Sequence, residues 1–177
     1  SESIDGINYN FVTTDNVTVN TNAGVCLFQN LELKQGTPTT YQYTVDGSLL
    51  QQKFTLPDSN IDTSTLIVQI QKSSIDTTVS SYKLGTNLAA LDENSEVFFL
   101  QEGLNGNYEI YFGDGVLGKQ LTDGNIVLIS YVVTKGTSSL GANNFVLLDN
   151  IAGVSTVYPL TPATNGSEKE SIDSIKY

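Results

Sequence analysis

The stretch Tyr108-Glu109-Ile110-Tyr111-Phe112-Gly113-Asp114-Gly115 decides the fold that the sequence predicts. Tyr108, Ile110 and Phe112 alternate with their neighbours, as apolar side chains on one face of a β-strand do. The Gly-Asp-Gly sequence then stops the strand, because glycine adopts positive φ without steric cost and aspartate favours turns. We therefore predict a strand that ends in a tight chain reversal.

A second strand is predicted directly after this reversal. Residues 126–133 read Ile-Val-Leu-Ile-Ser-Tyr-Val-Val, a run rich in β-branched side chains that suits a strand covered on both faces. We predict that residues 108–112 and 126–133 pair as the central hairpin. The structural turn motif that joins them comprises Phe112, Gly113, Asp114, Gly115, Gly118 and Gly124.

Further alternating segments separated by turn residues predict a mainly β protein, an antiparallel β-sandwich or open barrel. The only internal helical signal is one turn at 86–91, capped by Thr86 or Asn87. Residues 96–101, 107–112 and 125–134 are predicted to form a meander. The other predicted strands and extended segments are 7–11, 17–19, 25–28, 31–33, 41–45, 54–56, 66–70, 78–84, 144–148 and 151–160.

The domain organisation follows from where the strands lengthen. Residues 37–137 are predicted as an antiparallel β domain that contains the Phe-Gly-Asp-Gly hairpin, and 1–36 with 138–160 as a smaller flanking strand layer. Residues 161–177 are predicted as a linker and the start of a C-terminal helix, since Ser167 and Glu170 form a capping box. From this unfinished helix and the absence of methionine we expect a fragment of a longer parent chain.

The composition argues against several functions. The 177 residues carry a net charge of −11, with no histidine and no arginine, so the usual general base and the bidentate phosphate ligand are missing. The negative charge would repel nucleic acid and anionic membranes. No apolar run approaches the roughly 18 residues of a membrane span. We expect neither nucleic acid nor a membrane as a partner.

The single cysteine, Cys26, has no intrachain disulfide partner. It lies in the apolar run Val25-Cys26-Leu27-Phe28. Because free cysteine is among the most buried residue types, we predict that Cys26 is a small core residue.

Acidic residues near the hairpin suggest two kinds of chemistry. Glu102, Glu109 and Asp114 could converge as the paired carboxylates of a glycosidase, and Asp114 with Asp123 could bind calcium. Against this, Glu109 lies on the polar face of a strand and Asp114 is an ordinary turn residue. We favour the interpretation without catalytic, cofactor-binding or metal-binding residues.

Tyrosines offer another possibility, since their large amphipathic side chains suit a sugar-binding platform or a protein interface. They also suit the core and edges of a β-sandwich. The tyrosines concerned are Tyr41, Tyr43, Tyr82, Tyr108, Tyr111 and Tyr131.

The ordered set Phe112-Gly113-Asp114-Gly115-Val116-Leu117-Gly118, then Gly124, Tyr131 and Gly136, resembles the signature of the baseplate J-like family of contractile-tailed phages. Residues 6–13 and 24–36 resemble strands that precede this signature in the family, and 166–177 resembles the start of the helical segment that follows it. The likeness spans nearly the whole chain. The sequence differs from the family pattern at two places. It has Glu168-Lys169 where the family commonly has Asp-Pro, and it lacks a proline between Gly118 and Gly124.

The resemblance implies a structural role in the virion. Such proteins are wedge subunits of the tail baseplate, assembled in the host cytoplasm, that bind other wedge subunits and a second copy of themselves in a ring that rearranges when the sheath contracts. The family implies neither catalysis nor a cofactor. The alternative function is a carbohydrate-binding β-sandwich module of an adhesin or tail fibre.

Overall fold

A computed structural model describes residues 2–4, 6–103, 106–148 and 156–167. The protein is mainly β, as predicted. In the described residues no helix has the length and apolar character that crossing a membrane requires. The elements are β1 (Glu2–Ile4), β2 (Ile7–Tyr9), β3 (Phe11–Val12), β4 (Lys34–Gln35), β5 (Thr37–Thr44), β6 (Phe54–Thr55), β7 (Ile61–Gln71), β8 (Val79–Leu84), the 3-10 turn η1 (Leu88–Ala90), β9 (Val97–Glu102), β10 (Tyr108–Phe112), β11 (Ile126–Val133) and the 3-10 turn η2 (Gly136–Ser139).

The chain divides into two compact units. Unit 1 comprises Ser1–Pro38 and Val132–Tyr177, and unit 2 comprises Thr39–Tyr131, so the boundaries fall inside β5 and β11. Within unit 1, β1 pairs with β2, and β3 with β4. The predicted C-terminal helix falls largely on 168–177, and part of the predicted segment 151–160 on 151–155; both stretches lie outside the described residues.

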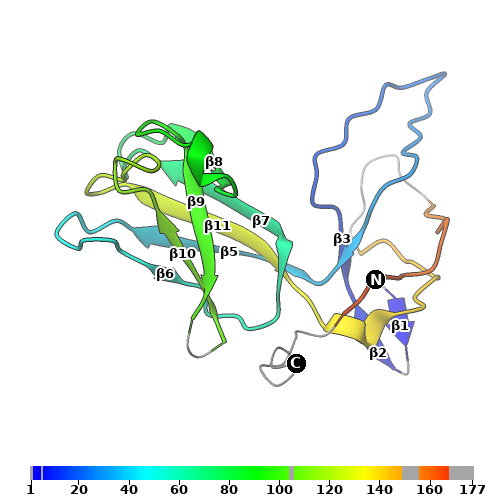
Figure 1. The fold of residues 1–177 in the computed structure, drawn as a ribbon. Coiled ribbons are helices and arrows are strands. Elements are labelled where there is room, and N and C mark those ends of the chain that lie inside the picture. The colour runs from blue at the N-terminus through cyan, green and yellow to red at the C-terminus, as the bar shows by residue number, and fades with distance from the viewer. Residues whose placement is uncertain (1, 5, 104–105, 149–155, 168–177) are drawn as a thin grey trace. The chain divides into compact units, whose positions relative to one another are not determined.

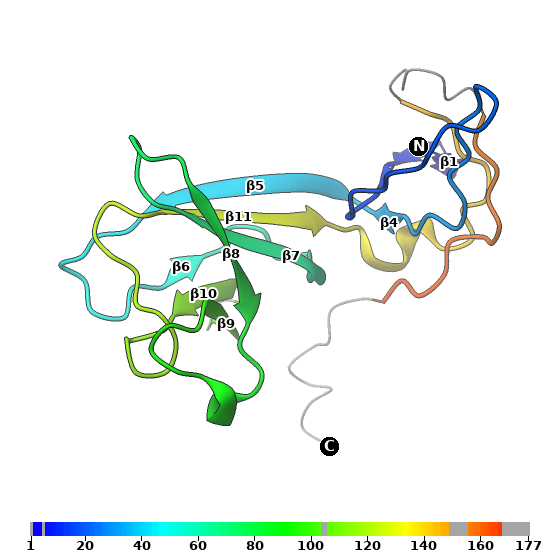
Figure 2. The same ribbon diagram turned by 90° about the horizontal axis from the view of Figure 1, so that it is seen from above.

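The strands of the main sheet lie in the order β5-β11-β7-β8-β9-β10-β6 and curl into a nearly closed barrel (Figures 1 and 2). The prediction of a purely antiparallel sheet is wrong at one place, because β8 and β9 pair in parallel through Lys83↔Val97 and Leu84↔Phe98. Parallel neighbours need a crossover. Residues 85–96 supply it, and η1 within them confirms the predicted helical turn; Asn87 is the N-cap residue, without a side-chain hydrogen bond.

The predicted central hairpin is wrong. β10 pairs with β9 and β6, which confirms the first two strands of the predicted meander, whereas β11 lies between β5 and β7. After β10 the chain crosses the end of β9, where Gly118 N donates to Asp92 O at 2.9 Å and Lys119 N to Ser95 O at 2.8 Å. The glycine-rich segment is thus long enough to carry the chain to another part of the sheet.

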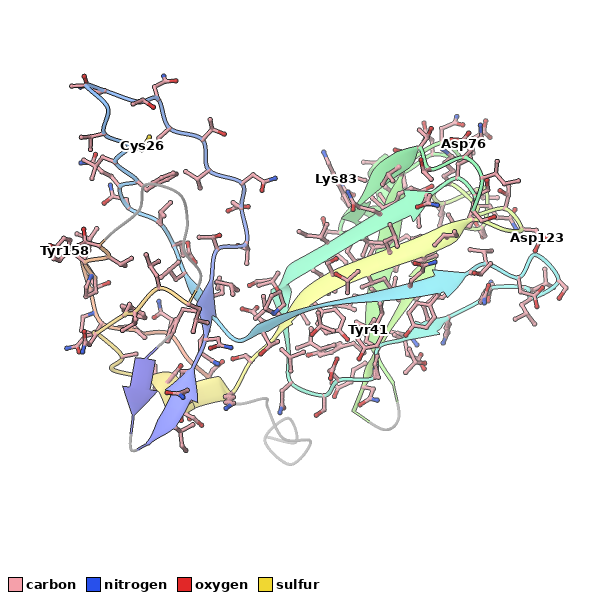
Figure 3. The ribbon with its side chains drawn as sticks, turned by 180° about the vertical axis from the view of Figure 1, so that it is seen from behind. Cys26, Tyr41, Asp76, Lys83, Asp123 and Tyr158 are labelled. Carbon is pink, nitrogen blue, oxygen red and sulfur yellow. The ribbon has the colours of Figure 1, made fainter. Side chains whose placement is uncertain are left out.

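Other predicted strands are also wrong. Residues 17–19 and 144–148 are irregular, and residues 25–33 contain no strand, although Val25 makes an isolated bridge with Asn22. Cys26 is exposed, with its sulfur 3.3 Å from Thr21 Oγ1, so its predicted burial is wrong as well (Figure 3). Residues 25–33 form no strand of the sheet, and the apolar run there is exposed, with Val25 at 63% and Leu27 at 65%.

The core of unit 2 fills the barrel. The alternation predicted for β10 is confirmed at Ile110, which is fully buried, and β11 is buried at Val127 and Ile129 on one face and at Ile126 on the other. The largest fully buried side chains are Leu56, Ile110, Ile129, Val68 and Val127.

Side chains join the first and last strands of the sheet. From β5, Tyr43 Oη donates to the carbonyl oxygen of Thr55 in β6 at 2.6 Å, and its ring centroid lies 5.5 Å from that of Phe54. Tyr41, also on β5 and labelled in Figure 3, has its ring centroid 5.9 Å from that of Tyr131 on β11, with the two rings stacked. The hydroxyl of Tyr43 therefore satisfies a carbonyl at the sheet edge and links the two ends of the nearly closed barrel.

Replacement of Tyr43 with phenylalanine tests this closure. Because the variant leaves the Thr55 carbonyl without this donor while keeping the ring, we expect the free energy of unfolding to fall by about 1 kcal/mol in urea denaturation. Tyr158→Phe, at a side chain that is 81% exposed, is the control and should change nothing. Equal stability of Tyr43→Phe and wild type would contradict a role for the hydroxyl in closure.

Candidate functional site

The loop after β10 is built around one carboxylate. Asp114 Oδ1 accepts hydrogen bonds from the backbone N–H groups of Val116 (2.9 Å) and Leu117 (3.0 Å). These two donors, that of Leu117 first, lower the pKa of Asp114 below its ordinary value of 3.8. Gly115 N donates to Gly118 O at 3.0 Å, and both glycines have positive φ. Asp114 therefore acts as the turn residue that the sequence predicts.

Gly113 and Gly118 allow the two sides of this loop to touch through their backbones. A Cβ atom on Gly113 would overlap the carbonyl group of Gly118, and one on Gly118 would lie 2.9 Å from Cγ2 of Val97. Both positions need glycine for close packing, and Gly118 also for its φ of 92°.

The two ends of the motif fix the loop to the barrel. The Phe112 ring makes edge contacts with Phe54 and Tyr82, at centroid distances of 5.8 and 5.6 Å. Gly124 has a φ of 77° and donates its N–H to Val45 O at 3.1 Å. Each residue of the motif thus serves packing or chain reversal, which is an architectural role.

The three acidic residues proposed for catalysis do not all meet. Glu102 and Glu109 line one polar groove, whereas Asp114 lies beyond the opposite end of β10, and that end, Phe112, is roughly 10 Å along the strand from Glu109 at about 3.3 Å per residue. Glu109 is also engaged, since its Oε2 accepts a hydrogen bond from Gln101 Nε2 at 2.8 Å and lies 3.6 Å from Lys53 Nζ. Nothing in this arrangement assigns a catalytic acid or base.

The two aspartates considered for calcium occupy separate turns. Asp123 Oδ1 accepts a hydrogen bond from Gly47 N at 2.9 Å, while Asp114 binds its own loop. Within the part of the chain that the structure describes, no three carboxylate, cysteine or histidine side chains lie close enough to share a metal ion.

The six tyrosines do not form one platform. Tyr82 and Tyr131 are buried, and Tyr41 and Tyr43 pack against aromatic rings of the barrel. Tyr131 Oη donates to Asp58 Oδ2 at 2.8 Å, and burial together with this carboxylate raises the pKa of Tyr131. On the outer face, Tyr111 stacks on Phe99 rather than on another tyrosine, and Tyr108 is half-buried in the same strand.

A repeated hydrogen-bond pattern in unit 2 was not predicted from the sequence. At three sites an aspartate accepts hydrogen bonds from both the N–H and the hydroxyl of the Ser or Thr two residues later, twice in turns and once within β7. The Asp-x-Ser/Thr spacing is a signal in the sequence for this pattern. The pairs are Asp46 with Ser48, Asp62 with Ser64 and Asp76 with Thr78.

No model of a known protein family matches the chain, and no curated protein sequence matches it.

Gly113 and Gly124 should respond differently to substitution. We expect Gly113→Ala to lower the free energy of unfolding by about 3 kcal/mol, because the methyl group overlaps backbone. Gly124→Ala has free space but a positive φ, and should cost about 1 kcal/mol. Since asparagine tolerates this φ better, Gly124→Asn should regain part of the loss in urea denaturation, whereas Gly113→Asn should not. An equal response at both sites would contradict the close backbone packing.

The aspartate turns should make stability depend on pH. Hydrogen bonds lower the pKa of Asp46, Asp92 and Asp114, chiefly from Ser48, Ser95 and Leu117 respectively. A carboxylate whose folded-state pKa lies below its unfolded value of 3.8 stabilises the protein above that pH, and this contribution is lost as pH falls through the folded-state pKa. We expect the urea concentration at the unfolding midpoint to decrease as the pH is lowered below about 4. The decrease should be less steep in the double variant Asp92→Asn/Asp114→Asn. An unchanged slope in that variant would contradict the assignment.

Proposed function

We propose that this chain is part of a wedge subunit of a phage tail baseplate, in which the barrel of unit 2 is a rigid spacer and unit 1 docks against neighbouring subunits. The resemblance of Phe112–Gly118, Gly124, Tyr131 and Gly136 to the baseplate J-like signature supports the family. The purely architectural use of the loop residues agrees with a signature of fold rather than of catalysis.

One observation carries the docking role: most of the large apolar side chains that the structure describes in unit 1 are exposed or only half-buried. Among its described residues the buried apolar side chains are Tyr9, Val132 and Ala142. So small a core cannot offset the entropy of ordering the segment, and exposed apolar groups in such numbers mark an interaction surface. The exposed large apolar side chains of unit 1 are Ile7, Val17, Val25, Leu27, Phe28, Leu31, Leu33, Leu140, Val146, Leu148, Tyr158 and Leu160.

Unit 2 also exposes some apolar side chains, such as Leu50 and Ile75, but it has a filled interior and turns held by aspartate hydrogen bonds. In a ring that rearranges on sheath contraction, the barrel keeps its shape while the contacts of unit 1 are exchanged. The partners of unit 1 are a second copy of this chain and other wedge subunits.

Sedimentation velocity tests the docking role. The chain is expected to self-associate as its concentration rises, and Val25→Asp/Leu27→Asp should weaken this association at least tenfold, because it places charges on side chains that are 63% and 65% exposed. The same variant should weaken binding to other wedge subunits.

Ile75→Asp is the matched control, since Ile75 is 95% exposed but belongs to unit 2. It should associate as wild type does. A chain that stays monomeric at every concentration, and binds no wedge protein, would refute the proposed function.

A further inference from the structure

A polar groove of about 480 Å³ lies on the outer face of the barrel and is separate from the turn motif. On β6, β9 and β10 the side chains of Phe54, Phe98 and Ile110 are buried in the barrel. Because side chains alternate along a strand, Thr55, Gln101 and Glu109 on the same strands point outward. The groove is lined by Lys53, Thr55, Gln101, Glu102, Gly103, Asn107 and Glu109.

The strand register places the polar centre of the groove beside an aromatic pair. Gln101 lies opposite Glu109, and Phe99 lies opposite Tyr111 one rung further along the same face. The Phe99 and Tyr111 rings are stacked, with centroids 5.2 Å apart and planes at 25°, and both side chains are half-buried. An amphipathic aromatic surface thus adjoins a set of hydrogen-bonding groups.

Glu109 organises the polar groups. It accepts the Gln101 amide at 2.8 Å and lies 3.6 Å from the Lys53 ammonium, and its side chain keeps 24% exposure. These contacts place an acceptor and two donors beside one another before a ligand arrives, and the Gln101 hydrogen bond reduces the ordering cost of binding.

Two glycines keep these surfaces accessible. A Cβ atom on Gly103 would lie 3.2 Å from Cδ of Glu109 and would crowd the groove. One on Gly85 would lie 2.7 Å from Cε1 of Phe99, so only glycine there lets that ring occupy its place beside Tyr111.

We propose that this groove binds a neutral oligosaccharide. The groove volume is in the range of small-molecule sites, which combine apolar contact area with a few placed polar groups. Hydroxyl groups can donate to the carboxylates and accept from the Lys53 ammonium and the Gln101 amide, while the apolar face of a sugar ring packs on Tyr111. The net charge of −11 disfavours anionic sugars, and the charged lining disfavours apolar ligands.

Titration of the isotopically labelled chain with maltohexaose, cellohexaose and chitohexaose, followed by amide NMR spectra, tests the assignment. At least one hexasaccharide should shift signals from residues 99–103 and 107–111. Gln101→Ala and Tyr111→Ala should each weaken its binding at least tenfold, and Tyr158→Ala, which removes an exposed tyrosine of unit 1, should leave it unchanged. Gln101→Ala keeps the test valid if Tyr111→Ala fails to fold.

Three outcomes would overturn the proposal: no shift with any of the three sugars at about 10 mM, well above the weak end of ordinary affinities; shifts that map elsewhere; or tighter binding of oligogalacturonate than of the neutral sugars. The result is independent of the docking role. Val25→Asp/Leu27→Asp should bind the sugar normally, and Gln101→Ala should self-associate normally.

Discussion

The structure of unit 2 depends on bringing β5 against β6, the two ends of one curled sheet. An open sheet edge exposes unpaired carbonyl and N–H groups that attract other chains. Here the Tyr43 hydroxyl takes up the Thr55 carbonyl, and the aromatic rings of Tyr43 and Phe54 fill the space beside it. The filled interior, with Leu56, Ile110 and Ile129 fully buried, is possible because the sheet closes around it.

The sequence predicted where the strands of the barrel lie better than which strands pair with each other. Alternation located β7 and β10, and a continuous apolar run located β9; both patterns are local. Partner choice is not local. The glycines after Phe112 permitted a hairpin equally well, and the hydrogen bonds from Gly118 to Asp92 and from Lys119 to Ser95 that direct the chain elsewhere join residues far apart in sequence.

For the candidate sites, residue type predicted the turn role of Asp114 but not which acids share a surface. Glu102 and Glu109 line the same groove, and the β9–β10 register places Gln101 opposite Glu109 and Phe99 opposite Tyr111. The error at Cys26 has a related cause: apolar composition predicts burial only where a segment has a sheet to pack against, and residues 25–33 form no strand. Burial in unit 1 is therefore governed by tertiary context that the sequence pattern does not contain.

The position of β11 in the sheet has a consequence for biosynthesis. This strand lies between β5 and β7, and Thr40 and Ser130, 90 residues apart, share a hydrogen bond of 2.8 Å across the β5–β11 pair. While the ribosome is still making the preceding residues, β5 has no neighbour in the sheet and one side of β7 is uncovered. Such long-range pairing slows folding and prolongs the exposure of unpaired strand edges and apolar side chains. The sheet of the nascent chain can thus be completed only after Val133 has left the exit tunnel.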